Sequence, residues 1–181
     1  YGMGAVNVTL DSFSGDGVGY DVRAAVDLAL SMEAHGADII DVGGESTRRY
    51  NDRPGAEAID ADEELRRVVP VLEQLVQKLA VPISIDTYKA EVADRCLGLG
   101  VSMINDIWGV RADPAMLQVA SRHEVPIVLM HNKIGHAYSD MVPEIIDELQ
   151  GAADKAREAG VRRENILVDP GIGFGKVAEQ C

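Results

Sequence analysis

The segment Val81–Ala93 (VPISIDTYKAEVA) indicates the fold class of the whole chain. It begins with a short apolar run that includes β-branched residues, reaches Asp86, and continues as a helical pattern from about Lys89. A run that is apolar on both faces is typical of a parallel strand covered by helices. Ligands of α/β proteins lie beyond the carboxyl ends of such strands, which makes Asp86 a candidate site residue. Asp is also a favoured helix N-cap, so a purely structural role stays open.

The same layout of strand, polar residue and helix recurs along the chain. Because no linker or charge block divides these units, we expect one domain over residues 1–181, built from βαβ units. Two architectures fit this pattern, an open doubly wound sheet and a (β/α)₈ barrel. The further strands are predicted at residues 2–9, 37–42, 101–106, 125–131 and 166–168, and the further helices at 21–35, 62–79, 113–122 and 143–159.

Polar residues at the strand ends favour the barrel. A doubly wound sheet binds its ligand at one switch point and needs functional groups at only one or two strand ends. The fold class predicted here is therefore α/β, an incomplete (β/α)₈ TIM barrel with about six β/α units. A complete barrel usually has about 250 residues, so further residues are expected beyond Cys181. The polar groups that end the predicted strands are Asn7, Glu45 to Arg48, Asp86, Asn105, His131 and Asp169.

Composition narrows the class of protein. The chain has 181 residues, 46% of them hydrophobic, and a formal charge of −13. This charge disfavours nonspecific binding to nucleic acid or to an anionic membrane. Cys96 and Cys181 are too few for a disulfide framework or a zinc site, and no signal peptide or spanning apolar run is recognisable. We expect a globular cytoplasmic protein with neither nucleic-acid nor membrane partners.

Two segments rich in glycine and polar residues, 11–19 and 43–58, are predicted to be mobile loops. Loops of this length within a compact domain are usually functional or disordered. The second loop contains several arginines, and exposed arginines are in most cases simply solvated.

Six motifs in series resemble the signatures of the dihydropteroate synthase family of pterin-binding enzymes. They are NVTLDSFS at 7–14, DIIDVGGESTR at 38–48, SIDTYK at 84–89, IND at 104–106, LMH at 129–131 and DPGIGFGK at 169–176. Several motifs in family order are far more specific than any one of them, and together they span nearly the whole chain. The resemblance implies a (β/α)₈ barrel that joins 6-hydroxymethyl-7,8-dihydropterin diphosphate to p-aminobenzoate and releases diphosphate, with Mg²⁺ on the diphosphate.

The resemblance assigns the pterin to Asp86, Asn105 and Asp169. A pterin presents adjacent N–H donors at one edge, and a carboxylate accepts such donors in pairs with short, strong hydrogen bonds. Met130 resembles a residue that lines the pterin, and Phe174 could cover the aminobenzoate. Each of these residues also has a structural interpretation, as a cap, a turn former or a core residue. His131 is a weaker candidate than the aspartates, and the role of Lys176 is left open.

The diphosphate end is assigned to Asn7, which matches a family position that reaches Mg²⁺; this metal takes oxygen ligands and few protein contacts. Thr47 and Arg48 resemble a mobile loop that closes over p-aminobenzoate and diphosphate. Phe13 and Ser14 resemble a first loop that shields a cationic intermediate from water. Metal and cationic donors on the departing oxygens would supply much of the catalysis.

Two family motifs are missing, a lysine motif on the seventh strand and an arginine–histidine motif on the eighth. The 181 residues are therefore expected to be inactive by themselves, whatever the parent gene encodes. Two alternatives stay open: a methyltetrahydrofolate:corrinoid methyltransferase domain, which shares the barrel and the pterin set, and a noncatalytic pterin-binding remnant. The resemblance also allows a homodimer of the full-length parent.

Overall fold

The computed structural model of the protein describes residues 1–8, 21–45, 58–133, 135 and 137–176. These residues fall into two compact units. The first unit is formed by the described residues up to Met103 apart from Tyr88–Ala90, and the second by those three residues and the described residues from Ile104 onwards. The single domain expected for residues 1–181 stays a prediction.

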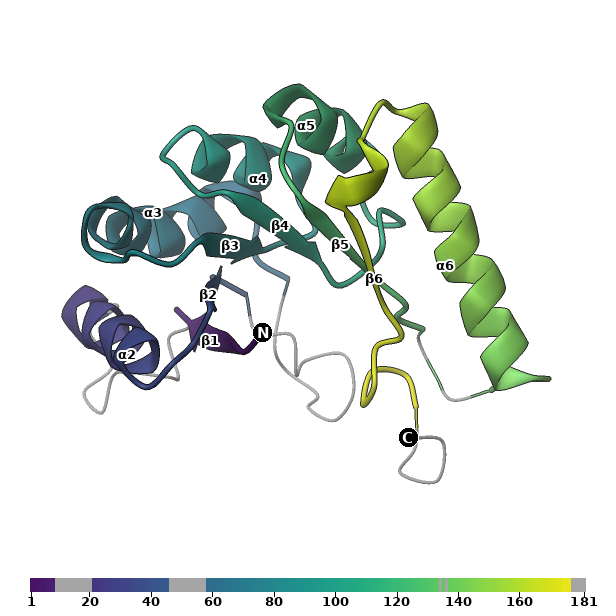
Figure 1. Ribbon diagram of the computed structural model, residues 1–181, viewed down its shortest axis with the longest axis horizontal. Coiled ribbons are helices and arrows are strands. Elements are labelled where there is room, and N and C mark those ends of the chain that lie inside the picture. The colour runs from purple at the N-terminus through teal and green to yellow at the C-terminus, as the bar shows by residue number, and fades with distance from the viewer. Residues whose placement is uncertain (9–20, 46–57, 134, 136, 177–181) are drawn as a thin grey trace. The chain divides into compact units, whose positions relative to one another are not determined.

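The first unit contains three parallel strands that lie side by side in chain order (Figure 1). Each strand is followed by a helix, and the buried faces of the helices carry mainly aliphatic side chains such as Val26, Leu72 and Leu75. The strands are β1 (Met3–Asn7), β2 (Ile39–Gly43) and β3 (Ile83–Asp86), and the helices are α2 (Val22–Ala34), α3 (Ala61–Lys78) and α4 (Ala90–Leu97).

Aspartates fix the starts of the first two helices. The side chain of Asp21 accepts a hydrogen bond from the Ala24 amide at 2.9 Å, and that of Asp60 accepts one from the Glu63 amide at 2.8 Å. Such caps satisfy amides that have no partner within the helix. Both helices therefore begin within one residue of where their periodicity predicted.

The second unit repeats the arrangement, again with three parallel strands in chain order (Figure 1). Helix α6 packs along the last two of these strands. The elements are β4 (Met103–Asp106), α5 (Met116–His123), β5 (Ile127–Met130), α6 (Met141–Glu158), the short 3₁₀ helix η2 (Arg163–Asn165) and β6 (Ile166–Asp169).

Two local features differ from the sequence prediction. Helix α5 begins at Met116 rather than near Asp113, because the Asp113 side chain accepts a hydrogen bond from the Ala115 amide at 3.1 Å and forms a turn before the helix. The helix η2 was not predicted. It is held by the Asn165 side chain, which donates to the Glu124 carbonyl at 2.9 Å.

Two of the features considered from composition, the cysteines and the apolar runs, can be compared with the described residues. Cys96 is buried in the core, and burial, with a smaller contribution from Glu64, raises the pKa of its thiol to about 12. It is therefore a core residue rather than a nucleophile. Within the described ranges, no helix is long and apolar enough to cross a membrane. The two predicted mobile loops lie mostly outside the described residues, as 9–20 and 46–57 are not described.

Candidate active site

The carboxyl ends of the first three strands place Asn7, Gly43 and Asp86 in one row. Asn7 pairs in register with Gly43, and Gly43 with Asp86. Residues paired in this way point to the same face of a parallel sheet, and neighbouring strands lie about 4.8 Å apart. The side chains of Asn7 and Asp86 therefore lie on one face, about 10 Å apart by this strand spacing, with a glycine between them.

This row lies on the face opposite to helix α2. A Cβ atom added to Gly4 would lie 2.8 Å from the Met32 sulfur of that helix, so Gly4 faces the helix layer. Successive residues of a strand alternate between the two faces, which directs Asn7 away from α2. The same alternation places Asp41 and Ser84, a buried in-register pair, one step earlier on the face of Asn7 and Asp86.

The glycine between Asn7 and Asp86 lies close against the Asp86 side chain. A Cβ at position 43 would lie 3.3 Å from the Cβ of Asp86 and 3.4 Å from its Oδ2. The next residue, Gly44, is more tightly confined, since a Cβ there would lie 2.9 Å from Val68 Cγ1 in α3. Arg67 of the same helix donates to the Gly44 carbonyl at 3.0 Å. The Gly-Gly pair thus lets the chain leave β2 between the Asp86 carboxylate and helix α3.

In the second unit, Asn105, Met130 and Asp169 share one face. Met130 pairs in register with Asp169, and Asn105 pairs with Val128, two residues before Met130. The Asp169 carboxylate accepts a hydrogen bond from the Gly171 amide at 2.7 Å, while its carbonyl accepts one from the His131 amide at 2.8 Å. Three of the predicted pterin residues are therefore brought together at the ends of neighbouring strands.

Asp106, directly after Asn105, holds the turn that follows β4. It is 1% exposed, and its carboxylate accepts hydrogen bonds from the amides of Trp108 at 2.9 Å and Val110 at 2.7 Å. Gly109 in this turn has φ +55°, and a Cβ there would lie 2.8 Å from the Met130 carbonyl oxygen. Burial, opposed by the two amide hydrogen bonds, raises the pKa of Asp106 from 3.8 to about 6.

The loop after β6 follows the backbone at the end of β5. Gly171, Gly173 and Gly175 all have positive φ, at +68°, +83° and +61°. A Cβ on Gly171 would overlap the carbonyl oxygen of His131, and one on Gly175 would overlap that of Lys133. The glycines of the DPGIGFGK motif therefore allow left-handed turns in this loop. They also allow the loop backbone to lie close to the backbone at the end of β5.

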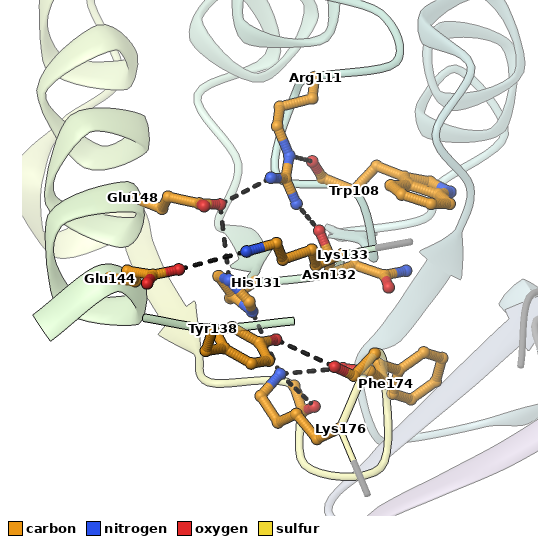
Figure 2. Close-up of polar contacts among 12 residues, drawn as sticks. Trp108, Arg111, His131, Asn132, Lys133, Tyr138, Glu144, Glu148, Phe174 and Lys176 are labelled. Carbon is orange, nitrogen blue, oxygen red and sulfur yellow. Dashed lines mark hydrogen bonds and ion pairs between the residues drawn. The ribbon is translucent and has the colours of Figure 1, made fainter. Parts of the chain in front are cut away.

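A buried lysine closes this loop (Figure 2). Lys176 Nζ lies 2.9 Å from the carbonyl oxygens of Gly171 and Phe174 and 3.1 Å from His131 Nδ1. On its other side, His131 Nε2 lies 3.5 Å from the Glu148 carboxylate. Burial, then the nearby Lys176 ammonium, lowers the pKa of His131, so its imidazole is neutral at pH 7.

Charged neighbours complete this cluster (Figure 2). Arg111 donates to Glu148 at 2.6 Å and also to the Asn132 carbonyl. Nearby, Lys133 pairs with Glu144 at 3.2 Å, and the Tyr138 hydroxyl donates to the Gly175 carbonyl at 3.0 Å. The segment after β5 and the glycine loop after β6 are therefore tied together by several polar contacts.

The predicted site residues divide according to what the structure describes. Phe13, Ser14, Thr47 and Arg48 lie outside the described residues. Phe174 is half-buried in the glycine loop. The residues that received no site assignment from the sequence, although each has a visible signal, are Gly43 in a Gly-Gly pair, Asp106 beside Asn105, and Lys176 at the end of a glycine-rich loop.

The Mg²⁺ implied by the resemblance can be compared with Asn7. Within the described part of the chain, no group of three or more His, Cys, Asp or Glu side chains forms a cluster that could hold a metal ion. Mg²⁺ bound mainly by substrate phosphates needs only one or two protein oxygens. The exposed amide of Asn7, at the carboxyl end of β1, offers one such oxygen. The residue type and its position therefore fit this ion.

Comparison with known proteins gives one family and a consistent set of relatives. The family described as pterin binding enzyme matches residues 3–181. A dihydropteroate synthase of Bacillus subtilis is 53% identical over 96% of this chain and 59% of its own length. The chain therefore spans about three fifths of that relative. All the relatives that we compared carry the same enzyme name, which does not favour the corrinoid methyltransferase alternative.

Solved structures agree with the sequence comparison. Dihydropteroate synthase of Clostridium difficile, crystallised in the presence of pteroic acid, is 48% identical with a TM-score of 0.92, over 99% of this chain and 67% of that one. The Xanthomonas albilineans enzyme with 4-aminobenzoic acid is 44% identical with a TM-score of 0.89, over 98% and 63%. Because these neighbours are (β/α)₈ barrels and the described residues form six parallel strands with helices, the predicted fold class is confirmed and the doubly wound alternative is excluded.

Proposed function

Because the chain belongs to the pterin-binding enzyme family, we propose that the whole protein is a dihydropteroate synthase. It condenses 6-hydroxymethyl-7,8-dihydropterin diphosphate with p-aminobenzoate and yields 7,8-dihydropteroate and diphosphate. The observation that carries this proposal is the row formed by Asn7, Gly43 and Asp86. It offers an oxygen ligand for a metal and a carboxylate about 10 Å apart on one face of the sheet, which suits a substrate with a diphosphate at one end and a pterin at the other.

The pterin is bound through Asp86, Asn105 and Asp169. Each residue lies at or next to the carboxyl end of its strand, where α/β barrels bind their ligands. The carboxylates accept hydrogen bonds from the pterin N–H groups, and charge-assisted bonds of this kind are about twice as strong as neutral ones. Met130, paired with Asp169, supplies an apolar surface for the ring. Phe174 lies on the glycine loop after Asp169, which suits a contact with the aminobenzoate.

Asn7 would supply a protein oxygen to Mg²⁺ at the diphosphate end of the substrate. When bound there, this ion would supply charge neutralisation for the leaving diphosphate. The amine of p-aminobenzoate forms a bond to the exocyclic carbon of the pterin, the bond from that carbon to the diphosphate oxygen breaks, and the amine loses a proton. Thr47 and Arg48 close over the aminobenzoate and the diphosphate, and Phe13 and Ser14 exclude water.

Two further properties belong to this proposal. The resemblance to dihydropteroate synthases supports a cytoplasmic location, and it supports a homodimer of the whole protein. Expression of a fluorescent fusion and sedimentation of the purified protein test these two points separately from catalysis.

The experiment that tests the function measures dihydropteroate formation by the whole protein and its affinity for pteroic acid. Replacing Asp86 by Asn keeps the shape but turns one acceptor into a donor that faces a donor, so pteroic acid should bind more weakly by about 1 to 3 kcal/mol. The control is Asp140→Asn, which changes the charge by the same amount at an exposed residue before α6. Unchanged affinity for Asp86→Asn, or absence of product with the unaltered protein, would contradict the proposal.

A further inference from the structure

Lys176 is an unusually buried ammonium. Its residue is 6% exposed, and Nζ lies within hydrogen-bonding distance of Gly171 O, Phe174 O and His131 Nδ1, at 2.9, 2.9 and 3.1 Å. An ammonium has three donors and no acceptor, and these three contacts match that number. Burial of a charge is strongly unfavourable unless the group is hydrogen-bonded. The buried ammonium of Lys176 therefore depends on these partners.

The partners of Lys176 lead to the Asp169 carboxylate. The carbonyl of Gly171 accepts from Lys176, and the amide of the same residue donates to Asp169 Oδ1 at 2.7 Å. The Phe174 amide donates to the Gly171 carbonyl at 3.0 Å, which closes the turn that Lys176 spans. Lys176 thus fixes Gly171 through its carbonyl. Gly171 in turn orients the Asp169 carboxylate through its amide.

His131 connects this arrangement to the end of β5. Its Nδ1 faces the ammonium of Lys176, which has only donors, so Nδ1 accepts and the proton of the neutral ring is on Nε2. That nitrogen faces Glu148 at 3.5 Å, and the His131 amide donates to the Asp169 carbonyl at 2.8 Å. The charged groups around the ring are Lys176, Glu148 and Arg111. His131 therefore supplies Lys176 with an acceptor that a protonated ring could not offer.

We propose that Lys176, supported by His131, is a positioning residue of the pterin site. It fixes the loop of residues 170–175 and thereby orients the Asp169 carboxylate toward the pterin, while it does not contact the substrate itself. The identity of the ligand in this inference rests on the proposed function. The fixation of the loop rests on the local contacts of Lys176. Two measurements separate these parts.

The first measurement is amide hydrogen exchange of the whole protein without ligand. Lys176→Met keeps the length of the side chain and removes its charge and donors, so exchange at the Gly171 and Phe174 amides should rise about tenfold or more as the loop opens locally. The matched control is Lys155→Met on the exposed face of α6, which should leave both amides unchanged. Unchanged protection in Lys176→Met overturns the inference and leaves the proposed function untouched.

The second measurement is the affinity for pteroic acid. Lys176→Met and His131→Phe, which removes the acceptor, should weaken binding about 10- to 100-fold. His131→Asn places an amide oxygen near the site of Nδ1 and should stay within about threefold of the unaltered protein. The two His131 variants keep the test valid if Lys176→Met does not fold.

A double-mutant cycle separates positioning from general destabilisation. If Lys176 acts through Asp169, the Lys176→Met change should alter affinity by less than about twofold in an Asp169→Ala background, yet keep its full effect in an Asp86→Asn background. Equal losses in both backgrounds overturn the inference. A protein that binds pteroic acid but forms no dihydropteroate overturns only the proposed function, whereas failure to bind pteroic acid overturns both.

Discussion

A single buried carboxyl group, Asp106, has a pH dependence that follows from its surroundings. Its carboxylate accepts from the amides of Trp108 and Val110, yet burial dominates and raises its pKa from 3.8 to about 6. A carboxyl group whose pKa is raised by folding stabilises the folded state in its protonated form. This contribution is complete below about pH 4 and is lost as the pH rises through 6.

We therefore expect a pH-dependent difference between the unaltered protein and Asp106→Asn. Between pH 5 and pH 8 the unaltered protein should lose about 1 kcal/mol of unfolding free energy relative to the variant, since one pKa unit corresponds to about 1.4 kcal/mol. Urea unfolding at several pH values measures this difference. Asp62→Asn, exposed in the first turn of α3, is the charge-matched control. A variant whose curve runs parallel to that of the unaltered protein would show that Asp106 has an ordinary pKa in the folded state.

For individual residues, the sequence showed the residue types but not their burial or their hydrogen-bond partners. Asp86, Asn105 and Asp169 could be selected because polar residues at strand ends are visible in the sequence. The burial of Asp106 could not, because it depends on a turn with positive φ at Gly109 and Val110 that places two amides around the carboxylate. Two of the three acceptors of Lys176 were also not predictable, since they are the backbone carbonyls of Gly171 and Phe174.

In the glycine loop after β6, alanine substitutions at Gly171 and Gly173 can be compared, because they differ only in whether the added Cβ meets a neighbouring atom. Gly171 and Gly173 both have positive φ, at +68° and +83°, so alanine is strained at either position. Only at Gly171 would the added Cβ overlap a neighbouring atom, the carbonyl oxygen of His131, whereas nothing lies within 4 Å of a Cβ at Gly173.

Gly173→Ala should therefore lower the unfolding free energy by about 1 to 2 kcal/mol, the cost of a left-handed alanine. Gly171→Ala should lower it by at least about 2 kcal/mol more, because the loop and the end of β5 must separate. Thermal unfolding of the two variants measures the difference, and pteroic acid binding by Gly171→Ala should fall in parallel. Equal destabilisation by the two substitutions would mean that the close approach to His131 is not a feature of the protein in solution.

The positions of the helices and strands were predicted well, because the apolar periodicity of the sequence marks them. Apolar residues at spacings of three and four marked α2 and α3, and aspartate caps agreed with that periodicity at their starts. Helix α5 began later than predicted because Asp113 forms a turn with Ala115. The register that aligns Asn7, Gly43 and Asp86 was not predictable, since it depends on pairing between strands that are distant in sequence.

The 181 residues together carry a formal charge of −13, which disfavours polyanionic partners such as nucleic acid. Nonspecific binding to DNA arises from release of counterions by lysine and arginine clusters. We expect no binding of duplex DNA at protein concentrations up to about 10 μM in 50 mM salt, a range in which nonspecific DNA-binding proteins associate readily. Fluorescence anisotropy with a labelled duplex measures this, and binding that weakens steeply with salt would reveal a cationic surface.

The fold class was predictable at this scale because six motifs occur in family order, and the comparisons confirm it. The roles of Phe13, Ser14, Thr47 and Arg48 rest on sequence alone, as these residues lie outside the described ranges. A short motif identifies which residues a loop contains. It does not predict the conformation of a long loop, because few apolar contacts determine that conformation.

The confined space at Gly43 also limits how the site can evolve. Every codon that differs from a glycine codon by one base, stop codons aside, encodes either glycine or a residue with a Cβ, and a Cβ at this position would lie 3.3 Å from that of Asp86. Any first substitution at position 43 therefore brings a Cβ into tight contact with Asp86, whose side chain must shift by a few tenths of an ångström to accommodate it. Genetic variation that changes ligand preference should accumulate at other positions, or reach position 43 only after a compensating change at position 86.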